Sequence, residues 1–297
     1  MKWEGQEQSE NVEDRRGDGG GGTGFGGSGI GGRHIGLGTV AIALVAGWIF
    51  GINPLTVLGL LSGGGGGPVV QQQAPAGPAH KPPPEDKTAA FVSVVLRDTE
   101  QVWGQVFQAS GAAYRDPKLV IFRGATPTAC GTGQTAMGPF YCPGDAKVYI
   151  DLDFFDTLSR RLGAPGQFAQ AYVIAHEVGH HVQNLMGVTG KVDAARARET
   201  QVQQNAVSVR VELQADCLAG VWAHHSQQSK GWLEQGDIEQ ALNAASKIGD
   251  DALQQASQGR VVPESFTHGT SAQRMNWFKR GFDSGAVNQC NTFDNRQ

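Results

Sequence analysis

Several features of common enzyme and binding classes are missing from this 297-residue sequence. It contains no G-x-S-x-G stretch, which disfavours a serine hydrolase with a nucleophile elbow. Its 4 cysteines include no C-x-x-C pair. The 24 Lys and Arg residues nearly balance the 28 Asp and Glu residues, and no basic stripe occurs, so we expect no nucleic-acid partner.

Charged side chains are also missing from a long stretch near the N-terminus. No Asp, Glu, Lys or Arg occurs between Arg33 and Lys81, and residues 35–61 are largely apolar. At about 1.5 Å per residue, a helix of this length can cross a hydrocarbon core of about 30 Å. We therefore predict a transmembrane helix over 35–61, by which the chain contacts the membrane. A cleaved signal peptide and a buried core helix are the less favoured alternatives.

The segments around this predicted span differ in charge and composition. Lys and Arg precede the span and do not follow it closely, which predicts a cytoplasmic N-terminus and a single-pass cell-membrane protein. Residues 1–34 are polar and glycine-rich and predict a disordered cytoplasmic tail, in which 11–17 are a solvated charge run or a recognition tag. Residues 62–88 predict a Gly/Pro-rich linker. The remaining domain, 89–297, would then be periplasmic or extracellular.

The domain over 89–297 has the pattern of an α+β fold that is mainly helical with a small sheet. Helical spacing of apolar residues predicts helices over 88–111, 167–186, 194–225, 237–257 and 270–282. Short β-branched or alternating runs predict strands at 119–122 and 147–152.

The cysteines are predicted to form two disulfides if the domain is exported. Cys130 and Cys142 bracket a glycine-rich loop with little core of its own, which a disulfide would pin. Cys217 and Cys290 would then be the second pair. Buried free thiols are the alternative.

A His-Glu-Val-Gly-His stretch occupies residues 176–180 within a predicted helix. Positions i and i+4 share one helix face, so His176 and His180 can bind one metal ion. Glu177 lies nearby, where a carboxylate can take a proton from water. Zinc suits imidazole ligands, and a catalytic zinc keeps three protein ligands and an open position. The stretch predicts a site for one Zn²⁺ per chain, although bare matches to it also arise by chance.

A candidate third ligand, Glu212, lies on the next long predicted helix. Asp216 follows at i+4 on the same face, where it could accept the second N–H of a metal-bound histidine. The alternative is that both carboxylates form surface salt bridges, for example with Arg210. Together with the histidine motif, they favour a site of two imidazoles and one carboxylate.

These residues resemble the gluzincins, metallopeptidases that bind zinc through H-E-x-x-H and a glutamate of a later helix. More closely, the chain resembles the bacterial YpfJ-type family of neutral zinc metallopeptidases over nearly its whole length. The resemblance rests on residues 13–17, the single apolar span, Cys142-Pro143 and the segments 176–181, 212–220 and 267–269. It implies a membrane-bound zinc peptidase with a gluzincin-like domain, and it implies no particular substrate.

Residues 267–274 are similar to a segment of HtpX-type gluzincins, in which a histidine and an arginine six residues apart follow the glutamate ligand. Gly269 stands here where that group usually has proline, which puts the local turn in doubt. The resemblance implies that His268 binds the developing oxyanion and that Arg274 supports the site. From the residues alone, a histidine and an arginine near a predicted helix start are more often capping or surface side chains.

The function predicted from these features is a membrane-anchored zinc endopeptidase acting on a peptide or protein substrate. Glu177 would act as the general base, and the strand over 147–152 would pair with an extended substrate peptide. One alternative is a zinc-binding but non-proteolytic envelope assembly or structural factor. Another is an envelope spacer that binds no metal.

Overall fold

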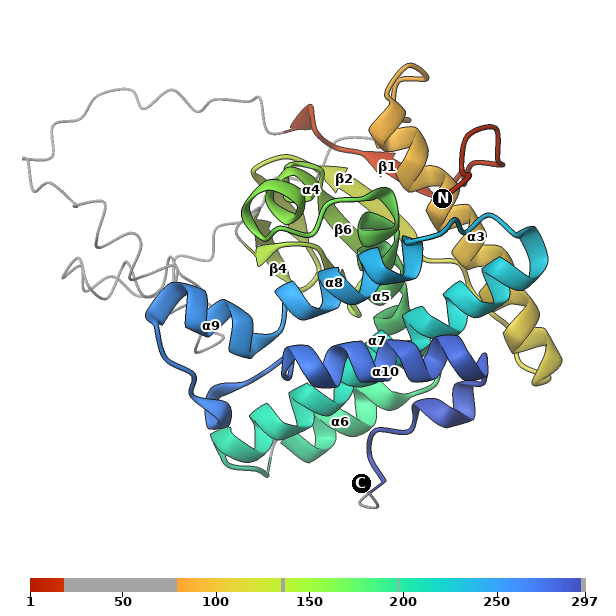
Figure 1. Ribbon diagram of the computed structural model, residues 1–297. Coiled ribbons are helices and arrows are strands. Elements are labelled where there is room, and N and C mark those ends of the chain that lie inside the picture. Colours follow the sequence, from red (N-terminus) through yellow and green to blue (C-terminus); the bar gives the residue numbers. More distant parts are fainter. Residues whose placement is uncertain (19–78, 135–136, 197, 295–297) are drawn as a thin grey trace, which may run out of the picture. The chain divides into compact units, whose positions relative to one another are not determined.

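The computed structural model describes residues 1–18, 79–134, 137–196 and 198–294. Residues 1–17 and the chain from residue 79 onward form one compact unit. This unit combines a small mixed sheet with a larger set of helices, as the sequence predicted (Figure 1).

The larger sheet has the strand order β1-β2-β6-β5. β1 (Val12–Asp14), β2 (Lys118–Phe122) and β6 (Lys147–Asp151) are parallel, and β5 (Phe140–Cys142) is antiparallel to β6. β2 is buried along four of its five residues, as its apolar sequence requires of a strand covered on both faces. β3 (Ala125–Thr128) and β4 (Gly131–Gln134) form a separate antiparallel hairpin.

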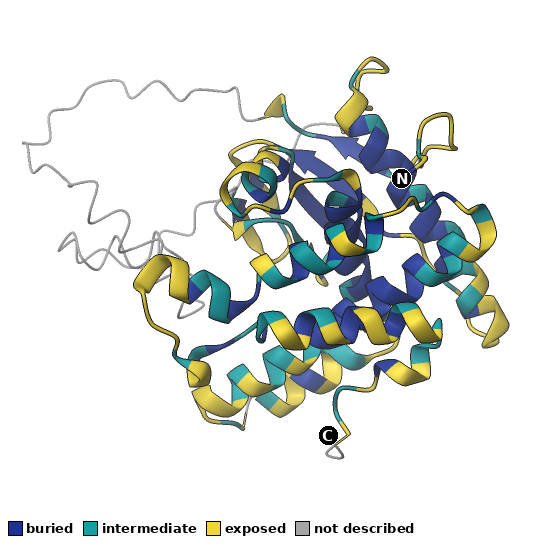
Figure 2. Cartoon of the chain, in the orientation of Figure 1, coloured by how far each residue is buried: buried dark blue, intermediate teal, exposed yellow. Residues whose placement is uncertain are grey.

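The helices of the described residues contribute most of the core. They are α3 (Lys87–Ala109), α4 (Asp153–Asp156), α5 (Gln167–Leu185), α6 (Val188–Arg196), α7 (Gln201–Lys230), α8 (Asp237–Lys247), α9 (Asp250–Gln258) and α10 (Ser271–Ser284), with a π-helical turn η3 (Thr157–Arg161) and 3-10 turns η4 (Pro263–Ser265) and η5 (Val287–Cys290). α5 contacts α3, α7, α8, β5 and β6, so it is the helix around which the unit packs. The sheet and the facing parts of these helices form the dark blue buried region of Figure 2.

Two predicted helices are interrupted in the structure. The helix predicted over 194–225 is replaced by α6 and α7, and α7 begins with a capping box in which the Thr200 side chain and Gln203 satisfy each other's backbone N–H groups. The helix predicted over 237–257 breaks at Gly249, whose backbone is extended and lies so close to Ser271 that a Cβ would be 2.4 Å from its nitrogen. The periodicity continued across both breaks, so it could not locate them.

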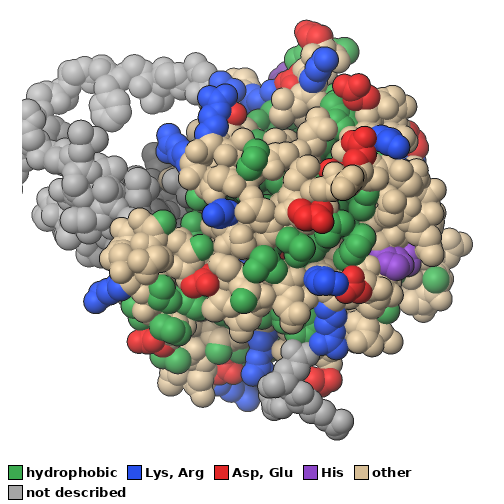
Figure 3. Space-filling model, viewed as in Figure 1, with side chains coloured by type: hydrophobic (Ala, Val, Ile, Leu, Met, Phe, Trp, Pro, Cys, Tyr) green, Lys and Arg blue, Asp and Glu red, His purple; other side chains and the backbone are tan. Residues whose placement is uncertain are grey.

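Both predicted disulfides are present, Cys130–Cys142 and Cys217–Cys290. The first ties the β3–β4 hairpin to the end of β5, and the second ties α7 to η5. The face of the molecule in Figure 3 carries side chains of both charges among neutral ones.

The first 17 residues are part of the folded unit, whereas their composition predicted disorder. β1 pairs with β2, and Glu13 binds Lys147 at 2.8 Å and Lys118 at 3.1 Å. Arg16 binds Asp86 at the start of α3. The charged run at 11–17 is therefore neither a solvated run nor a free tag, because its charges are paired with later parts of the chain.

The predicted membrane topology is also corrected. Among the described residues, no helix is long and apolar enough to cross a membrane. The segment predicted as a transmembrane helix, 35–61, lies outside the described residues, as does most of the predicted linker over 62–88.

The pairing of strands in the sheet also contradicts the predicted membrane topology. β1 precedes the predicted span and β2 follows it, yet the two strands hydrogen-bond to each other. A single span would put the N-terminus and the later domain on opposite sides of a bilayer. The single-pass arrangement, with a cytoplasmic N-terminus and a periplasmic or extracellular domain, is therefore wrong.

Candidate functional site

The histidine motif lies on α5 where this helix packs closely against α7. A Cβ added to Gly179 would lie only 3.0 Å from the backbone oxygen of Ala215 and 3.2 Å from its Cα, so the helices can approach here only because residue 179 has no side chain. Gly220 of α7 serves a contact with a different helix, because its missing Cβ makes room for the Phe278 oxygen of α10.

Three side chains of the two helices converge at this contact. The Nε2 atom of His176 lies 3.1 Å from one carboxylate oxygen of Glu212, and the Nε2 atom of His180 lies 3.5 Å from the other. Each residue offers one ligand atom, and these three atoms all lie within 4.8 Å of one another. Two imidazole nitrogens and one carboxylate oxygen are the donor set of many catalytic zinc sites, so these residues fit a zinc ion.

The charges of this group favour a cation. Burial opposes ionisation of Glu212, yet the neighbouring histidines His180 and His268 hold its pKa well below the usual range. Burial likewise opposes protonation of His180, while Glu212 raises the pKa of that imidazole. A carboxylate this strongly biased towards its charged form is suited to binding a divalent ion.

Asp216 accepts a hydrogen bond from the first histidine and is itself tightly held. Its Oδ1 lies 2.8 Å from His176 Nδ1, and the Tyr172 hydroxyl donates to the same oxygen at 2.5 Å. Arg274 donates to both carboxylate oxygens, at 2.9 and 3.0 Å. Asp216 and Arg274 are 0% and 2% exposed, so this is a buried, fully paired network.

The network sets the ionisation of its members. Burial would raise the pKa of Asp216, but Arg274 and His176 lower it to about 2. Burial would lower the pKa of His176, but Asp216 and Glu212 raise it to about 10 in the absence of a metal ion. With an acceptor fixed at Nδ1, the Nε2 atom of His176 is the one left to bind a metal.

Glu177 follows the first histidine on α5 and is 7% exposed. Its burial raises the pKa of the carboxyl group, although His176 and His180 oppose the shift. A general base works best when its pKa lies nearer the operating pH than that of a free glutamate.

His268 lies in the segment before α10, and Asp250 holds its Nδ1 side. Asp250 accepts backbone N–H groups from Thr267, His268 and Gly269, and it lies 3.2 Å from His268 Nδ1. Burial opposes protonation of His268, but Glu212 and Asp250 raise the pKa of this imidazole above its ordinary value. Gly269 has φ +92°, a conformation that proline cannot adopt, so the turn is built differently from that of the HtpX-type segment.

The structure adds residues that the sequence reasoning missed. Tyr172 precedes His176 by one helical turn and Gln183 follows His180 by three residues, so helical spacing could have indicated both. Asp250 had no such signal, because only the break before α9 places it beside His268. His181 lies about 100° round the helix from His180 and points elsewhere, to the Arg115 backbone oxygen at 2.6 Å.

Comparisons with known proteins agree with this geometry. The family described as "Putative neutral zinc metallopeptidase" matches residues 1–293. The chain is 55% identical over 294 residues to the "Uncharacterized protein YpfJ" of Escherichia coli (strain K12), covering 99% of each chain. It is 46% identical over 190 residues to the "Uncharacterized protein Rv2575" of Mycobacterium tuberculosis, covering 61% of this chain and 63% of that one. No solved structure matches.

The family match spans both the N-terminal strand and the helices that carry the histidines and the glutamate. The family description implies zinc, and the His176, His180 and Glu212 group has the donors that zinc prefers. The chain therefore belongs to the family described as "Putative neutral zinc metallopeptidase".

Proposed function

We propose that this chain is a zinc-dependent endopeptidase that hydrolyses bonds within a peptide or protein substrate. The observation that carries the proposal is the convergence of His176, His180 and Glu212, whose ligand atoms lie within 4.8 Å of one another, with Glu177 next to His176 on α5. Structural zinc sites usually have four protein ligands, whereas three ligands leave a position for chemistry.

His176, His180 and Glu212 would hold the ion through two Nε2 atoms and a carboxylate oxygen. When bound, zinc supplies Lewis-acid polarisation of a carbonyl group and lowers the pKa of water. Glu177 takes one proton from the attacking water as the water oxygen bonds to the carbonyl carbon. Glu177 then returns that proton to the nitrogen as the C–N bond breaks, so the protein ends each cycle unchanged.

His268 would donate a hydrogen bond to the oxyanion that develops on the carbonyl oxygen. Asp250 supports this role because it binds Nδ1 of His268 and three backbone N–H groups of the same segment. Arg274 is placed differently. Its guanidinium pairs with Asp216, so we assign it to positioning His176 rather than to contact with substrate.

The strand that would bind an extended substrate is β5 rather than β6. β6 was the sequence-based candidate, but β2 and β5 occupy both of its edges. β5 is at the end of the sheet order and next to α5, where the Tyr141 hydroxyl lies 3.1 Å from His181 and 3.0 Å from Asn184. A peptide could add to this edge through main-chain hydrogen bonds.

Substitution of Glu177 tests the proposal. Glu177→Gln removes the base and leaves the three ligands, so zinc content should stay near one ion per chain while peptide cleavage falls by roughly 10²–10⁴-fold. The measurement is metal analysis of the full-length chain with a chelator-sensitive assay on a peptide library. Wild-type protein that binds zinc and cleaves nothing would favour the non-proteolytic assembly factor, and cleavage unchanged in Glu177→Gln would remove Glu177 as the base.

A further inference from the structure

The two histidines of the site are held by different kinds of partner. His176 Nδ1 meets the charged Asp216, whereas His180 Nδ1 lies 2.9 Å from the amide oxygen of Gln183, which has no charge. Gln183 is 1% exposed, and its amide is buried between α5 and α7.

The amide of Gln183 can adopt only one orientation. Its nitrogen lies 2.7 Å from the backbone oxygen of Val211 and 3.0 Å from the side-chain oxygen of Gln214. Both partners are acceptors, so the nitrogen must face them and the oxygen must face His180. An oxygen acceptor there requires that His180 carry a proton on Nδ1, so Nε2, which is directed at Glu212, is the nitrogen left for a metal ion.

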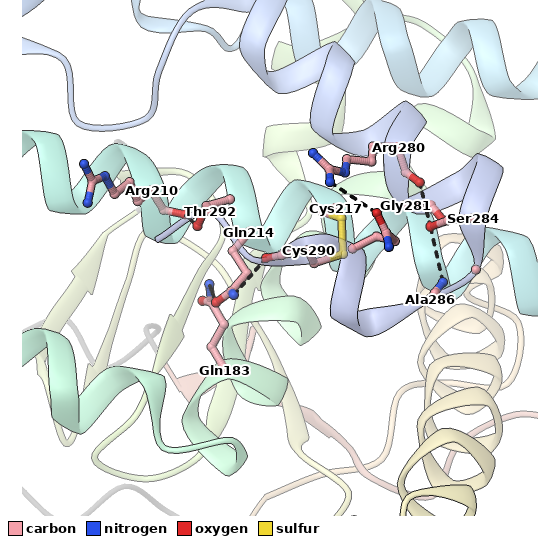
Figure 4. The surroundings of a disulfide bond; sticks show 12 residues. Gln183, Arg210, Gln214, Cys217, Arg280, Gly281, Ser284, Ala286, Cys290 and Thr292 are labelled. Atoms are coloured by element: carbon pink, nitrogen blue, oxygen red, sulfur yellow. Dashed lines mark hydrogen bonds between the residues drawn. A yellow bond between two sulfur atoms is a disulfide. The ribbon is translucent and has the colours of Figure 1, made fainter. Parts of the chain in front are cut away.

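The orientation of Gln214 is determined in the same way, one step further from the site. Its nitrogen donates at 2.9 Å to the backbone oxygen of Cys290, a contact drawn as a dashed line in Figure 4. A backbone oxygen can only accept, so the amide oxygen of Gln214 is the atom left to meet Gln183.

The Cys290 backbone oxygen, at the end of this series of contacts, belongs to a residue that a disulfide fixes in place. Cys290 forms the disulfide with Cys217 of α7, visible in Figure 4 beside Gln214. Two residues later, Thr292 donates to the backbone oxygen of Arg210 at 2.6 Å. The C-terminal segment is therefore clamped along α7 on the stretch that also carries Glu212.

We propose that Gln183 and Gln214 form a neutral relay that transmits the position of the Cys290 carbonyl to His180. The relay makes Gln183 a positioning residue, because it sets the tautomer of His180 and also binds the backbone next to Glu212. The Cys217–Cys290 disulfide then supports the metal site as well as the fold, and breaking it weakens zinc binding. This inference rests on the proposed metal site.

Zinc affinity of shape-matched variants of the full-length chain tests the relay, measured by competition with a chromophoric chelator. Gln183→Met keeps the shape of the side chain and removes both amide functions, and it should lower zinc affinity by about 10–100-fold. Gln214→Met should have a smaller effect in the same direction. The matched control is Gln254→Met, because Gln254 is also buried (8% exposed) and its amide binds Ser265 and Val262, away from the two histidines.

The disulfide has its own matched pair of variants. Cys217→Ser with Cys290→Ser should lower zinc affinity, whereas Cys130→Ser with Cys142→Ser should leave it within about twofold of wild type. Equal affinity in wild type and in the variant lacking Cys217–Cys290 would remove the disulfide from the relay.

A readout that does not depend on zinc separates this inference from the proposed function. Imidazole ¹⁵N NMR of the metal-free protein, recorded at a pH alkaline enough for the ring to be neutral, should show the His180 proton on Nδ1 in wild type and a mixture of tautomers in Gln183→Met. Unchanged tautomer and unchanged zinc affinity in that variant would overturn the relay. Wild-type protein without zinc affinity would instead overturn the metal site. If Gln183→Met does not fold, Gln214→Met carries the same two measurements.

Discussion

The supports of His176 and His180 achieve the same result by different physics. Each histidine has an acceptor at Nδ1 and directs Nε2 towards Glu212. The support of His176 is ionic, with Asp216 between a tyrosine and Arg274. The support of His180 is neutral and ends at a backbone oxygen. The ionic support is expected to be the stronger of the two and the one that is sensitive to pH.

Breaking the ionic support should have the largest effect. Asp216→Ala leaves Arg274 buried without its counter-charge, which should lower the free energy of unfolding by about 3–5 kcal/mol. It also removes the acceptor of His176, so zinc affinity should fall by at least 10–100-fold. Denaturant unfolding and chelator competition measure the two effects.

A second substitution shows whether the unpaired charge is the cause. Adding Arg274→Met to Asp216→Ala removes the buried guanidinium and should recover part of the unfolding free energy. It should not recover the zinc affinity, because His176 still lacks its acceptor. A loss below about 1 kcal/mol in Asp216→Ala alone would show that the ion pair contributes little.

Acid should distinguish the two supports. The pKa of Asp216 is lowered from 3.8 to about 2 in the fold, so its contribution to stability is complete above about pH 4 and is lost as the pH falls towards 2. The contribution is on the order of 2 kcal/mol.

The measurement is the difference in unfolding free energy between wild type and Asp216→Asn in metal-free protein, followed from neutral pH to pH 3. That difference should shrink as the pH falls. The corresponding difference for Gln183→Met should change little over the same range, because the amide does not titrate. A Gln183 effect that follows pH as closely as the Asp216 effect would contradict the distinction.

The smallest effect is expected from the Tyr172 hydroxyl, which donates a hydrogen bond to Asp216. Tyr172→Phe removes one hydrogen bond to Asp216 and should cost about 1 kcal/mol of unfolding free energy. Tyr114→Phe is a matched control, because the buried hydroxyl of Tyr114 has no hydrogen-bond partner among the described residues. Its removal should be neutral or slightly stabilising, as thermal unfolding would show.

Spacing along one helix made part of the site predictable. The period of a single helix places His176, Glu177 and His180 close together. Asp216 follows Glu212 by one helical turn, so local geometry was enough to predict both groups of residues. The break at Gly249 and the role of Asp250 depend on the approach of Ser271 and the 267–269 segment, which no local pattern records. The same limit applied to residues 1–17, whose composition is polar but whose charges find partners more than 60 residues away.

The sequence by itself determined which chemical groups could meet at the candidate site, two imidazoles and a carboxyl group on one helix and a carboxylate on another, and it predicted two cysteine pairs. Helical periodicity and ligand preference are local properties, so they can be read without a fold. Only the tertiary structure decided which nitrogen of each histidine faces the metal site, which glutamines hold one of them, and that the N-terminal strand joins the sheet. Those outcomes depend on contacts between distant segments, where the cost of burying an unpaired polar group selects the partners.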